Sequence, residues 1–376
     1  MSTPKSILCI HQGAELYGSD RMFVMSVAAL RERYPKAKIT IVLPNSGPLI
    51  EYLEPVCDEI IYQDQFVLRR VDLGVRFLLR IPQLQKMILQ AYRLIRKSDL
   101  VYISTILITC FSLASRLVNV PRFVHMHEMP LGFEGKVFSR FLKTCRLHGI
   151  AISQAVADSL YKKGDHRVTI VHNGINPPKA SETPWKRADK LKILMIGRFN
   201  GWKGQNLLVQ ALGLLSAEEL SQIEVRFVGS CFRGQEHFLE ELKELCIQQP
   251  LGCEHSFHDF TPTAGDCFAW SDLVAVPSTK PEPFGLVAIE AMAYEKPVIA
   301  AQHGGLAEIL DEKSGVYFTP NSADSLAKSI QKYLHNRELC AQHGKHAKQF
   351  FDRYYTQEAY TKRFVDAIEG QLQSQI

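Results

Sequence analysis

The sequence predicts an α/β protein built from two doubly wound parallel-sheet domains. Short β-rich runs alternate with helical stretches along the whole chain, and several of these runs are almost continuously apolar. Such runs are typical of parallel strands that are covered on both faces, and the alternation is typical of a doubly wound sheet. The alternation stops once, at a proline-rich segment, and then restarts. With 376 residues and a prior of about 150 residues per domain, two or three units are expected.

The first half alternates from its first strand to residue 171. Its expected strands are 6–10, 38–43, 59–62, 100–104, 122–124, 150–153 and 168–171. Its expected helices lie between them, at 22–33, 77–97 and 155–163. Consecutive strands joined by helices predict one parallel sheet.

A polar, proline-rich linker from Pro177 to Pro184 separates the halves. The second half repeats the pattern, with expected strands at 192–196, 224–228, 254–260, 273–276 and 297–300 and helices at 205–216, 238–248, 285–294 and 323–334. The tail, 337–351 and 357–373, is helical. The expected domains are therefore 1–178 and 179–355, with the final helix, about 356–376, packing back on the first. Two such halves favour a central cleft between them, where a ligand would bind.

Composition and charge exclude several classes of protein. The chain is 46% hydrophobic and 22% charged with a net charge of +5, which excludes a disordered chain and falls short of a dedicated nucleic-acid binder. The nine cysteines form no C-x-x-C pair, which suits a reducing compartment. The apolar run at 6–10 is too short for a signal peptide, and the 16-residue charge-free stretch 100–115 is too short for a membrane span of about 20 residues. A cytoplasmic location is expected.

The segment after the strand at 273–276 carries the most informative motif. A helix is expected to begin about Pro283–Gly285, and the free N–H groups at its start form a site for a phosphate. Glu282 lies just before this start and Glu290 on the second turn. This layout fits a nucleotide diphosphate-sugar, with Glu282 on sugar hydroxyls and Glu290 on ribose hydroxyls. The alternative is two surface glutamates near a helix start, where acids are favoured anyway.

A second segment supplies cations. The strand at 192–196 runs into a glycine-bearing turn, Gly197-Arg-Phe-Asn-Gly-Trp-Lys-Gly204. Arg198 can form two parallel hydrogen bonds to a phosphate, and Lys203 adds a point charge. The alternative is a common surface turn. The turn is not a P-loop, and no G-x-G-x-x-G follows the first strand.

These motifs resemble those of the retaining nucleotide-sugar glycosyltransferases of glycosyltransferase family 4, which have the GT-B fold. The resemblance rests on E-x7-E at Glu282 and Glu290, on G-R…K-G at 197–204, on G-G-x-x-E at 304–308 and on N-G-I at 173–175. It spans almost the whole chain and is strongest from Val168 to Leu310.

The resemblance implies roles for individual residues. Arg198 and Lys203 would neutralise the leaving diphosphate, and Glu290 would hold the ribose. Sugar and phosphate would be positioned by Glu282 with the backbone of Phe284, Gly285 and Leu286. Near the N-terminus, where the family has G-G-x-E, Tyr17 replaces the first glycine and Asp20 the acid. Gly18 is therefore the expected donor contact, and Asp20 or Ser19 could equally be a helix cap.

His127 follows a short strand at a position where the family often has a histidine before an acid. It would contact the donor sugar near the reacting carbon; the alternative is an ordinary loop histidine. No D-x-D occurs, so no metal or other cofactor is expected beyond a UDP-, GDP- or dTDP-linked donor. The resemblance implies that the departing phosphate acts as base, without a protein nucleophile.

Basic residues concentrate between Arg69 and Lys97, with eight Lys and Arg against Asp72 alone, interleaved with apolar residues. An ordinary helix with a solvated basic face explains any single charge. The cluster as a whole suits anionic lipid headgroups, so peripheral contact with the inner membrane face is expected. Nucleic-acid binding is the weaker interpretation because no recognised module accompanies the charge.

The sequence thus predicts a metal-independent hexosyl-type glycosyltransferase that acts on a glycan or lipid-linked glycan, with bacterial surface polysaccharide synthesis (lipopolysaccharide, O-antigen or capsule) as the expected pathway. One alternative is a GT-B nucleotide-sugar epimerase or phosphorylase. Another is a non-catalytic scaffold subunit, which the intact set of Arg198, Lys203, Glu282 and Glu290 disfavours.

Overall fold

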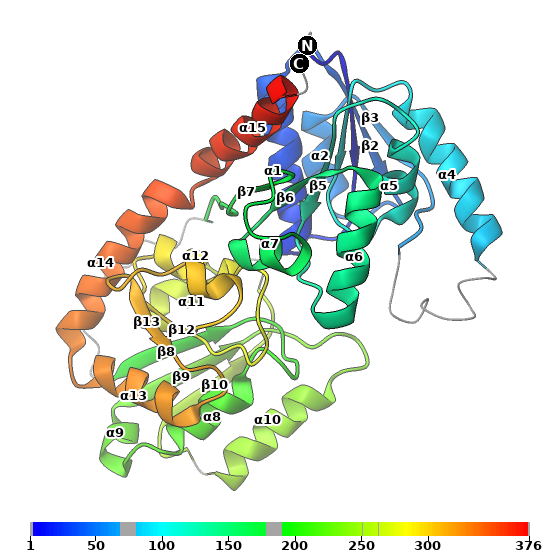
Figure 1. Cartoon of the computed structure of the whole chain (residues 1–376). Coiled ribbons are helices and arrows are strands. Elements are labelled where there is room, and N and C mark those ends of the chain that lie inside the picture. The colour runs from blue at the N-terminus through cyan, green and yellow to red at the C-terminus, as the bar shows by residue number, and fades with distance from the viewer. Residues whose placement is uncertain (1–2, 68–79, 178–189, 250, 262, 375–376) are drawn as a thin grey trace. The chain divides into compact units, whose positions relative to one another are not determined.

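The computed structural model describes residues 3–67, 80–177, 190–249, 251–261 and 263–374. The chain divides into two compact units, each with its own sheet (Figure 1). Unit 1 comprises Met1–Asn173 together with Gln357–Ile376, and unit 2 comprises Gly174–Thr356. The first division falls a few residues before the proline-rich segment on which the sequence analysis placed it.

Unit 1 is a seven-stranded sheet in the order β3-β2-β1-β4-β5-β6-β7, and every pair of neighbours is parallel. Its strands are β1 (Ser6–Ile10), β2 (Lys38–Leu43), β3 (Glu59–Tyr62), β4 (Leu100–Ile103), β5 (Arg122–Met126), β6 (His148–Ala151) and β7 (Val168–Ile170). The predicted doubly wound sheet is confirmed. β6 begins two residues earlier than expected, and Ser153, predicted as its end, instead caps the next helix by accepting a hydrogen bond from Val156 N.

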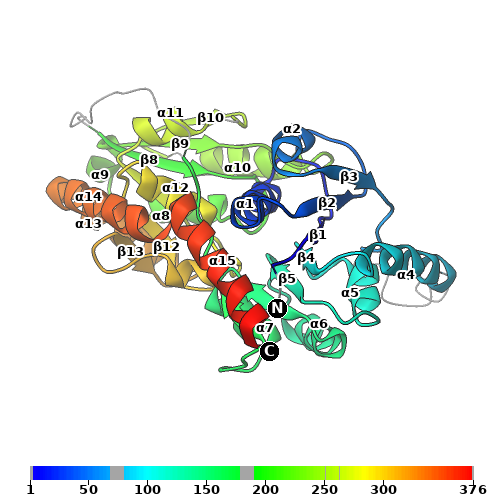
Figure 2. The same ribbon diagram turned by 90° about the horizontal axis from the view of Figure 1, so that it is seen from above.

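The helices of unit 1 cover both faces of this sheet. They are α1 (Gly18–Arg33), α2 (Ile50–Leu53) with the short turn η1 (Glu54–Val56), α4 (Ile81–Ile95), α5 (Thr109–Ser115), α6 (Gly132–Cys145), α7 (Gln154–Leu160) and α15 (Gln357–Ser374). Figure 2 shows α1 and α15 on one side of the sheet and α4 and α5 on the other. The sequence analysis missed α6, in which Gly132 has a positive φ of 60° and Gly135 lies against Pro130. Two glycines in the first turn weaken the helical signal there.

The last helix of the chain, α15, packs on the first, α1 (Figure 1). Tyr360, Phe364 and Ile368 of α15 are fully buried in the core of unit 1. Ser26 of α1 makes a 2.6 Å hydrogen bond with the Tyr360 hydroxyl and accepts one of 2.8 Å from Tyr102 of β4. The tail is therefore an integral part of the first unit, although it follows the second in sequence.

Gly370, in the body of α15, is a position where the fold leaves room for a side chain. A Cβ built there meets no atom within 4 Å. Alanine loses less backbone entropy than glycine in a helix, so Gly370→Ala is expected to raise the free energy of unfolding by about 0.5–1 kcal/mol. Urea unfolding measures this change, and a lower midpoint than wild type would contradict it.

Unit 2 is a six-stranded parallel sheet in the order β10-β9-β8-β11-β12-β13. Its strands are β8 (Leu191–Ile196), β9 (Ile223–Val228), β10 (Glu254–His258), β11 (Leu273–Val276), β12 (Val298–Ala301) and β13 (Gly315–Phe318). Its helices are α8 (Gln205–Leu212), α9 (Ala217–Ser221), α10 (His237–Gln248), α11 (Gly265–Trp270), α12 (Leu286–Ala293), η3 (Gly305–Glu308), α13 (Ala323–Leu334) and α14 (Arg337–Tyr354). The edge strand β13 and the short helices α9 and α11 were not predicted.

Each sheet has one point where the strand order reverses, between β1 and β4 in unit 1 and between β8 and β11 in unit 2. Loops that leave the carboxyl ends of such neighbouring strands diverge to opposite faces and leave a crevice, which is the usual ligand position in this architecture. Both segments that the sequence analysis singled out follow the strands at the reversal point of unit 2, β8 and β11.

Candidate functional site

Three loops meet at the carboxyl ends of β8, β11 and β12 in unit 2. The turn after β8 touches the segment after β11, since Thr279 N donates to Trp202 O at 2.8 Å. Gly204, with φ of 88°, lies so close that a Cβ there would be 1.9 Å from Pro277 O. The loop after β12 joins them, because Gly305 N donates to Glu282 O at 2.7 Å. The two motifs and the G-G-x-x-E turn therefore form one site.

An ion pair between Lys203 and Glu282 lies at the centre of this site. Lys203 Nζ is 2.7 Å from Glu282 Oε1, and the two side chains are only 20% and 8% exposed. The same oxygen accepts a hydrogen bond from the buried Ser278 hydroxyl, and His303 Nε2 contacts Ser278 O at 2.8 Å. A half-buried cation and a buried carboxylate are thus held together by side chains from three loops.

Helix α12 starts later than the sequence analysis expected. It begins at Leu286, and Gly285 precedes it with φ of 127°, a conformation that only glycine adopts readily. Pro283 therefore lies outside the helix rather than in its first turn. Phe284 is buried and packs edge-on against Tyr355. Glu290 lies one turn into α12 and is half-buried.

Arg198, two residues after the end of β8, contacts an aromatic ring rather than Glu282. Its guanidinium carbon lies 3.4 Å from the centroid of the Phe232 ring, which is 43% exposed. Cation–π stacking of this kind holds a guanidinium plane in one orientation. Sequence reasoning gave no role to Phe232, Ser278 or His303. Ser278 lies four residues before Glu282 and His303 directly precedes the G-G-x-x-E turn, whereas Phe232 carries no sequence signal.

The residues predicted in unit 1 gather at its own reversal point. Asp20 of α1 binds His11 Nε2 at 2.6 Å and accepts a 2.8 Å hydrogen bond from Tyr17 N. Asp20 is thus a buried helix-capping acid, and Gly18 is the first residue of α1. His127 follows β5, and its ring centroid is 4.2 Å from that of His125.

His127 is neutral at physiological pH. Burial, reinforced by the neighbouring His11 and opposed by Asp20, lowers the pKa of His127 to about 3. Burial and His127 likewise hold the pKa of His125 well below its ordinary value. His127 Nε2 is buried without a hydrogen-bond partner among the described residues. This ring can exchange neutral hydrogen bonds with a ligand but brings no positive charge to it.

Buried histidines make the stability of the fold depend on pH. Burial lowers the pKa of His148, which contacts the Thr169 hydroxyl at 3.0 Å, to about 4. Between pH 6.5 and 4, His148 is protonated in the unfolded chain but stays neutral in the folded protein. The free energy of unfolding therefore falls as the pH falls. We expect His148 alone to contribute about 3 kcal/mol to this loss.

Urea unfolding at pH 7.5 and 4.5 measures this loss. His148→Gln should show a smaller difference between the two pH values than wild type, while the same change at the exposed His258 should leave the difference unaltered. Equal differences in all three proteins would refute the assignment to His148.

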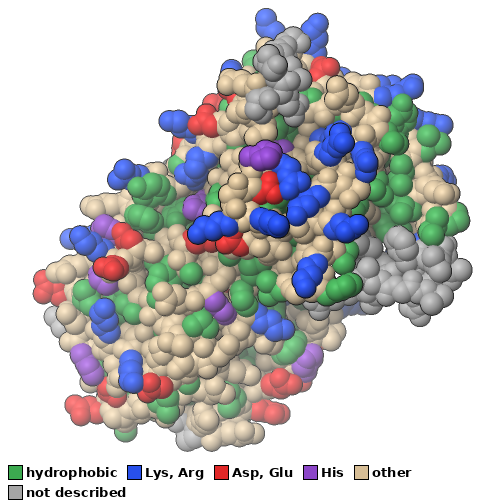
Figure 3. All heavy atoms as spheres, in the orientation of Figure 1, with side chains coloured by type: hydrophobic (Ala, Val, Ile, Leu, Met, Phe, Trp, Pro, Cys, Tyr) green, Lys and Arg blue, Asp and Glu red, His purple; other side chains and the backbone are tan. Residues whose placement is uncertain are grey.

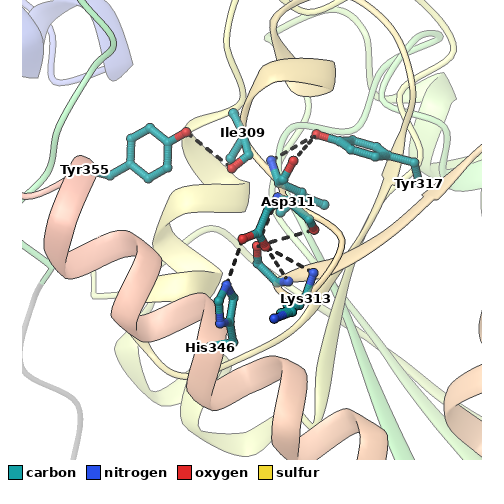
Figure 4. A network of polar contacts seen from close by, with 8 residues as sticks. Ile309, Asp311, Lys313, Tyr317, His346 and Tyr355 are labelled. Atoms are coloured by element: carbon teal, nitrogen blue, oxygen red, sulfur yellow. Dashed lines mark hydrogen bonds and ion pairs between the residues drawn. The ribbon is translucent and has the colours of Figure 1, made fainter.

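Behind the G-G-x-x-E turn, a network of polar contacts fixes residues 306–318 (Figure 4). The Tyr317 hydroxyl donates to Leu306 O at 2.9 Å, and Tyr355 donates to Ile309 O at 3.2 Å. His346 of α14 binds Asp311 at 2.8 Å. Partial burial raises the pKa of Asp311, but hydrogen bonds from Ser314 and His346 outweigh it and leave this pKa below its ordinary value. These contacts hold the G-G-x-x-E turn, which pairs with Glu282, in one position.

Across the described ranges, no group of three His, Cys, Asp or Glu is arranged to hold a metal ion.

Residues 179–350 match the protein family described as Glycosyl transferases group 1. The match covers most of unit 2, including Arg198, Lys203, Glu282 and Glu290. Among curated proteins, the chain is 27% identical to an uncharacterized glycosyltransferase of Methanocaldococcus jannaschii over 63% of this chain and 66% of the relative. It is 31% identical to a lipopolysaccharide 1,2-N-acetylglucosaminetransferase of Salmonella typhimurium over 48% of this chain and 49% of the relative. The alignments thus leave a third to a half of these relatives unmatched.

Solved structures match nearly the whole chain. HepE of Anabaena in complex with UDP and glucose superposes with a TM-score of 0.76 at 22% identity, covering 97% of this chain and 100% of that one. The apo form of the lipopolysaccharide outer core galactosyltransferase WaaB superposes with a TM-score of 0.75 at 15% identity, covering 97% and 99%. The two Rossmann-like units and these neighbours show that the fold is GT-B.

Proposed function

We propose that this chain is a retaining, metal-independent glycosyltransferase of family 4 that moves a sugar from a nucleotide-diphosphate donor to a glycan or lipid-linked glycan. The observation that supports this proposal most is the buried Lys203–Glu282 pair beside the start of α12, within the part of the chain that matches Glycosyl transferases group 1. The relative HepE, whose structure contains UDP and glucose, is consistent with a nucleotide-sugar donor.

In this proposal Lys203 and Arg198 offset the charge that develops on the departing diphosphate. Lys203 is already fixed by Glu282, and Arg198 by the Phe232 ring, so neither side chain must be ordered when the charge appears. The remaining carboxylate capacity of Glu282 accepts hydrogen bonds from sugar hydroxyls. The first N–H groups of α12 face the phosphates, and Glu290 accepts from the ribose.

In unit 1, Gly18 at the start of α1 lets the backbone approach the phosphates, and His127 contacts the donor sugar near the reacting carbon. Because the pKa of His127 is about 3, we assign it a hydrogen bond to a hydroxyl rather than the stabilisation of charge. The departing phosphate serves as base for the acceptor hydroxyl.

A donor screen tests the proposal. Purified protein is incubated with UDP-, GDP- and dTDP-sugars, and released nucleotide, free sugar and altered sugar are separated by chromatography. Slow release of nucleotide together with the unaltered free sugar supports a transferase. Conversion of the sugar within the nucleotide would indicate an epimerase, and release of no nucleotide from any donor would indicate a scaffold subunit or a phosphorylase.

The proposal also covers the pathway in which the protein acts and its location in the cell. A role in bacterial surface polysaccharide synthesis is supported by the names of two relatives, the lipopolysaccharide N-acetylglucosaminetransferase and WaaB. In the described part of the chain, no helix has the length and apolar character needed to cross a membrane. We propose that the protein works in the cytoplasm and contacts the inner membrane face peripherally.

The predicted membrane-contact segment, Arg69–Lys97, lies partly outside the described residues, which include Arg80 and the residues after it. Within it, Lys86 and Lys97 are exposed on or just after α4. Figure 3 shows a further group of Lys and Arg side chains over the part of unit 1 that α6 and α7 occupy. On α6 and just after α7, Lys136, Arg140 and Lys162 are exposed. Both surfaces can be compared by liposome flotation.

A further inference from the structure

Both cations of the candidate site in unit 2 lie against an aromatic ring. Lys203 Nζ is 4.7 Å from the centroid of the Trp202 ring, and the Arg198 guanidinium carbon is 3.4 Å from that of Phe232. Both distances are within the range of about 6 Å in which the negative face of a ring attracts a cation. Trp202 thus gives Lys203 a second partner besides Glu282.

The backbone of Trp202 is fixed on both sides of the residue. Its N–H donates to Asn200 Oδ1 at 3.0 Å. Its carbonyl accepts hydrogen bonds from the Thr279 N–H at 2.8 Å and from the Thr279 hydroxyl at 3.2 Å. Thr279 stands in the loop that carries Glu282. The ring beside Lys203 is therefore held by the same contact that joins the turn after β8 to the loop after β11.

The loop of Phe232, which follows β9, packs directly on the turn that carries Arg198. A Cβ on Gly229 would lie 2.0 Å from Gly197 O, so the two backbones touch with no side chain between them. At the tip of the loop, Gln235 N donates to Phe232 O at 2.9 Å and closes a turn. The backbone therefore fixes the place of the second ring as well.

Aromatic faces suit the two cations better than further carboxylates would. A second carboxylate would cancel charge that the departing diphosphate needs, whereas a ring carries no net charge. Stacking also uses the face of the Arg198 guanidinium and not its in-plane N–H groups, which are the groups that bind phosphate. For Lys203, the ring of Trp202 can hold the ammonium while Glu282 accepts hydrogen bonds from the sugar.

We propose that Trp202 and Phe232 are positioning residues for Lys203 and Arg198, and that the electron density of their ring faces, rather than their volume, carries this role. The inference rests on the proposed function, because it is the diphosphate of the donor that the two cations would meet. It adds two residues that act through these cations rather than on the donor.

Fluorinated phenylalanines test the inference, because fluorine withdraws electron density from the ring face and barely alters the shape of the ring. Phenylalanine and its mono-, di- and trifluorinated derivatives are placed at position 202 or 232 by stop-codon suppression. Calorimetric titration with UDP, GDP and dTDP measures the affinity for a nucleoside diphosphate. For the nucleotide that binds, the dissociation constant should rise stepwise along each series, by about two- to fivefold in total.

Three comparisons separate the ring face from simple packing. The same series at Phe133, which is 75% exposed on α6 of unit 1, is the matched control and should leave the affinity unchanged. Phe232→Tyr keeps an aromatic face and should bind as tightly as wild type. Phe232→Leu and Trp202→Leu keep an apolar side chain without that face and should bind as weakly as the trifluorinated proteins.

The outcomes for this inference and for the proposed function differ. If the wild-type protein binds a nucleotide but the affinity is the same along a series, or the leucine variant binds as wild type, that ring has no positioning role and the proposed function is untouched. If the wild-type protein binds none of the three nucleotides, the proposed function fails, and the inference that rests on it fails too.

Discussion

Lys203→Met is expected to lower sugar transfer by a factor of about 100–1,000, the usual cost of removing one preorganised group that stabilises transition-state charge. The same variant should be less stable, because Glu282 is left as a buried carboxylate without its cation. Breaking one side of a buried ion pair typically costs about 3–5 kcal/mol. Steady-state kinetics and urea unfolding on the same preparation measure the two effects.

A second variant separates catalysis from folding. Lys203→Met combined with Glu282→Gln removes both charges, so most of the lost stability should return while transfer stays at or below the level of Lys203→Met. Lys280→Met is the control, because Lys280 is an exposed lysine of the adjoining loop. Near-wild-type turnover by Lys203→Met would refute the assignment of the site, and recovery of turnover in the double variant would show that Lys203 acts only by balancing Glu282.

Gly204→Ala is expected to lower the free energy of unfolding by about 3 kcal/mol or more. The residue combines a φ of 88° with a Cβ position 1.9 Å from Pro277 O. The left-handed conformation alone costs about 1–2 kcal/mol for a residue with a side chain, and the clash must also separate two loops of the site. Transfer should fall as well, because Lys203 and Glu282 stand on these loops.

Two other glycines separate the cost of the left-handed conformation from the cost of the contact with Pro277. Gly164 has a similar φ of 78° but nothing within 4 Å of its Cβ position, and Gly370 has neither restriction. Urea unfolding of the three alanine variants should therefore rank Gly204 as most destabilised, Gly164 as destabilised by strain alone and Gly370 as stabilised. Equal losses at Gly204 and Gly164 would show that the contact with Pro277 yields without cost.

The sheet cores were predictable because their strands are short, apolar and separated by regular helices. β1, β2, β3 and β11 have the expected bounds. Elements were missed where the local signal is weak. The edge strand β13, Gly315–Phe318, begins with a glycine whose Cβ would lie 2.2 Å from Val298 O, so tertiary packing rather than propensity defines it.

The candidate site was predictable as a set of residue types but not as a geometry. Order along the chain placed Lys203 and Glu282 after neighbouring strands, yet their direct pairing depends on Gly204 fitting against Pro277. The start of α12 was misplaced because Pro283 resembles a first helical residue, whereas the φ of Gly285 sets the real boundary.

The return of α15 to unit 1 has a consequence for biosynthesis. A ribosome releases residues in chain order, so Gly174–Thr356 is complete before the last piece of the first unit, Gln357–Ile376, has emerged. Until then the surface that Tyr360 and Phe364 will cover, including Ser26 and Tyr102, faces solvent. The nascent chain therefore finishes its second unit first, and a ribosome stalled near residue 356 would leave the earlier unit open to chaperones and proteases.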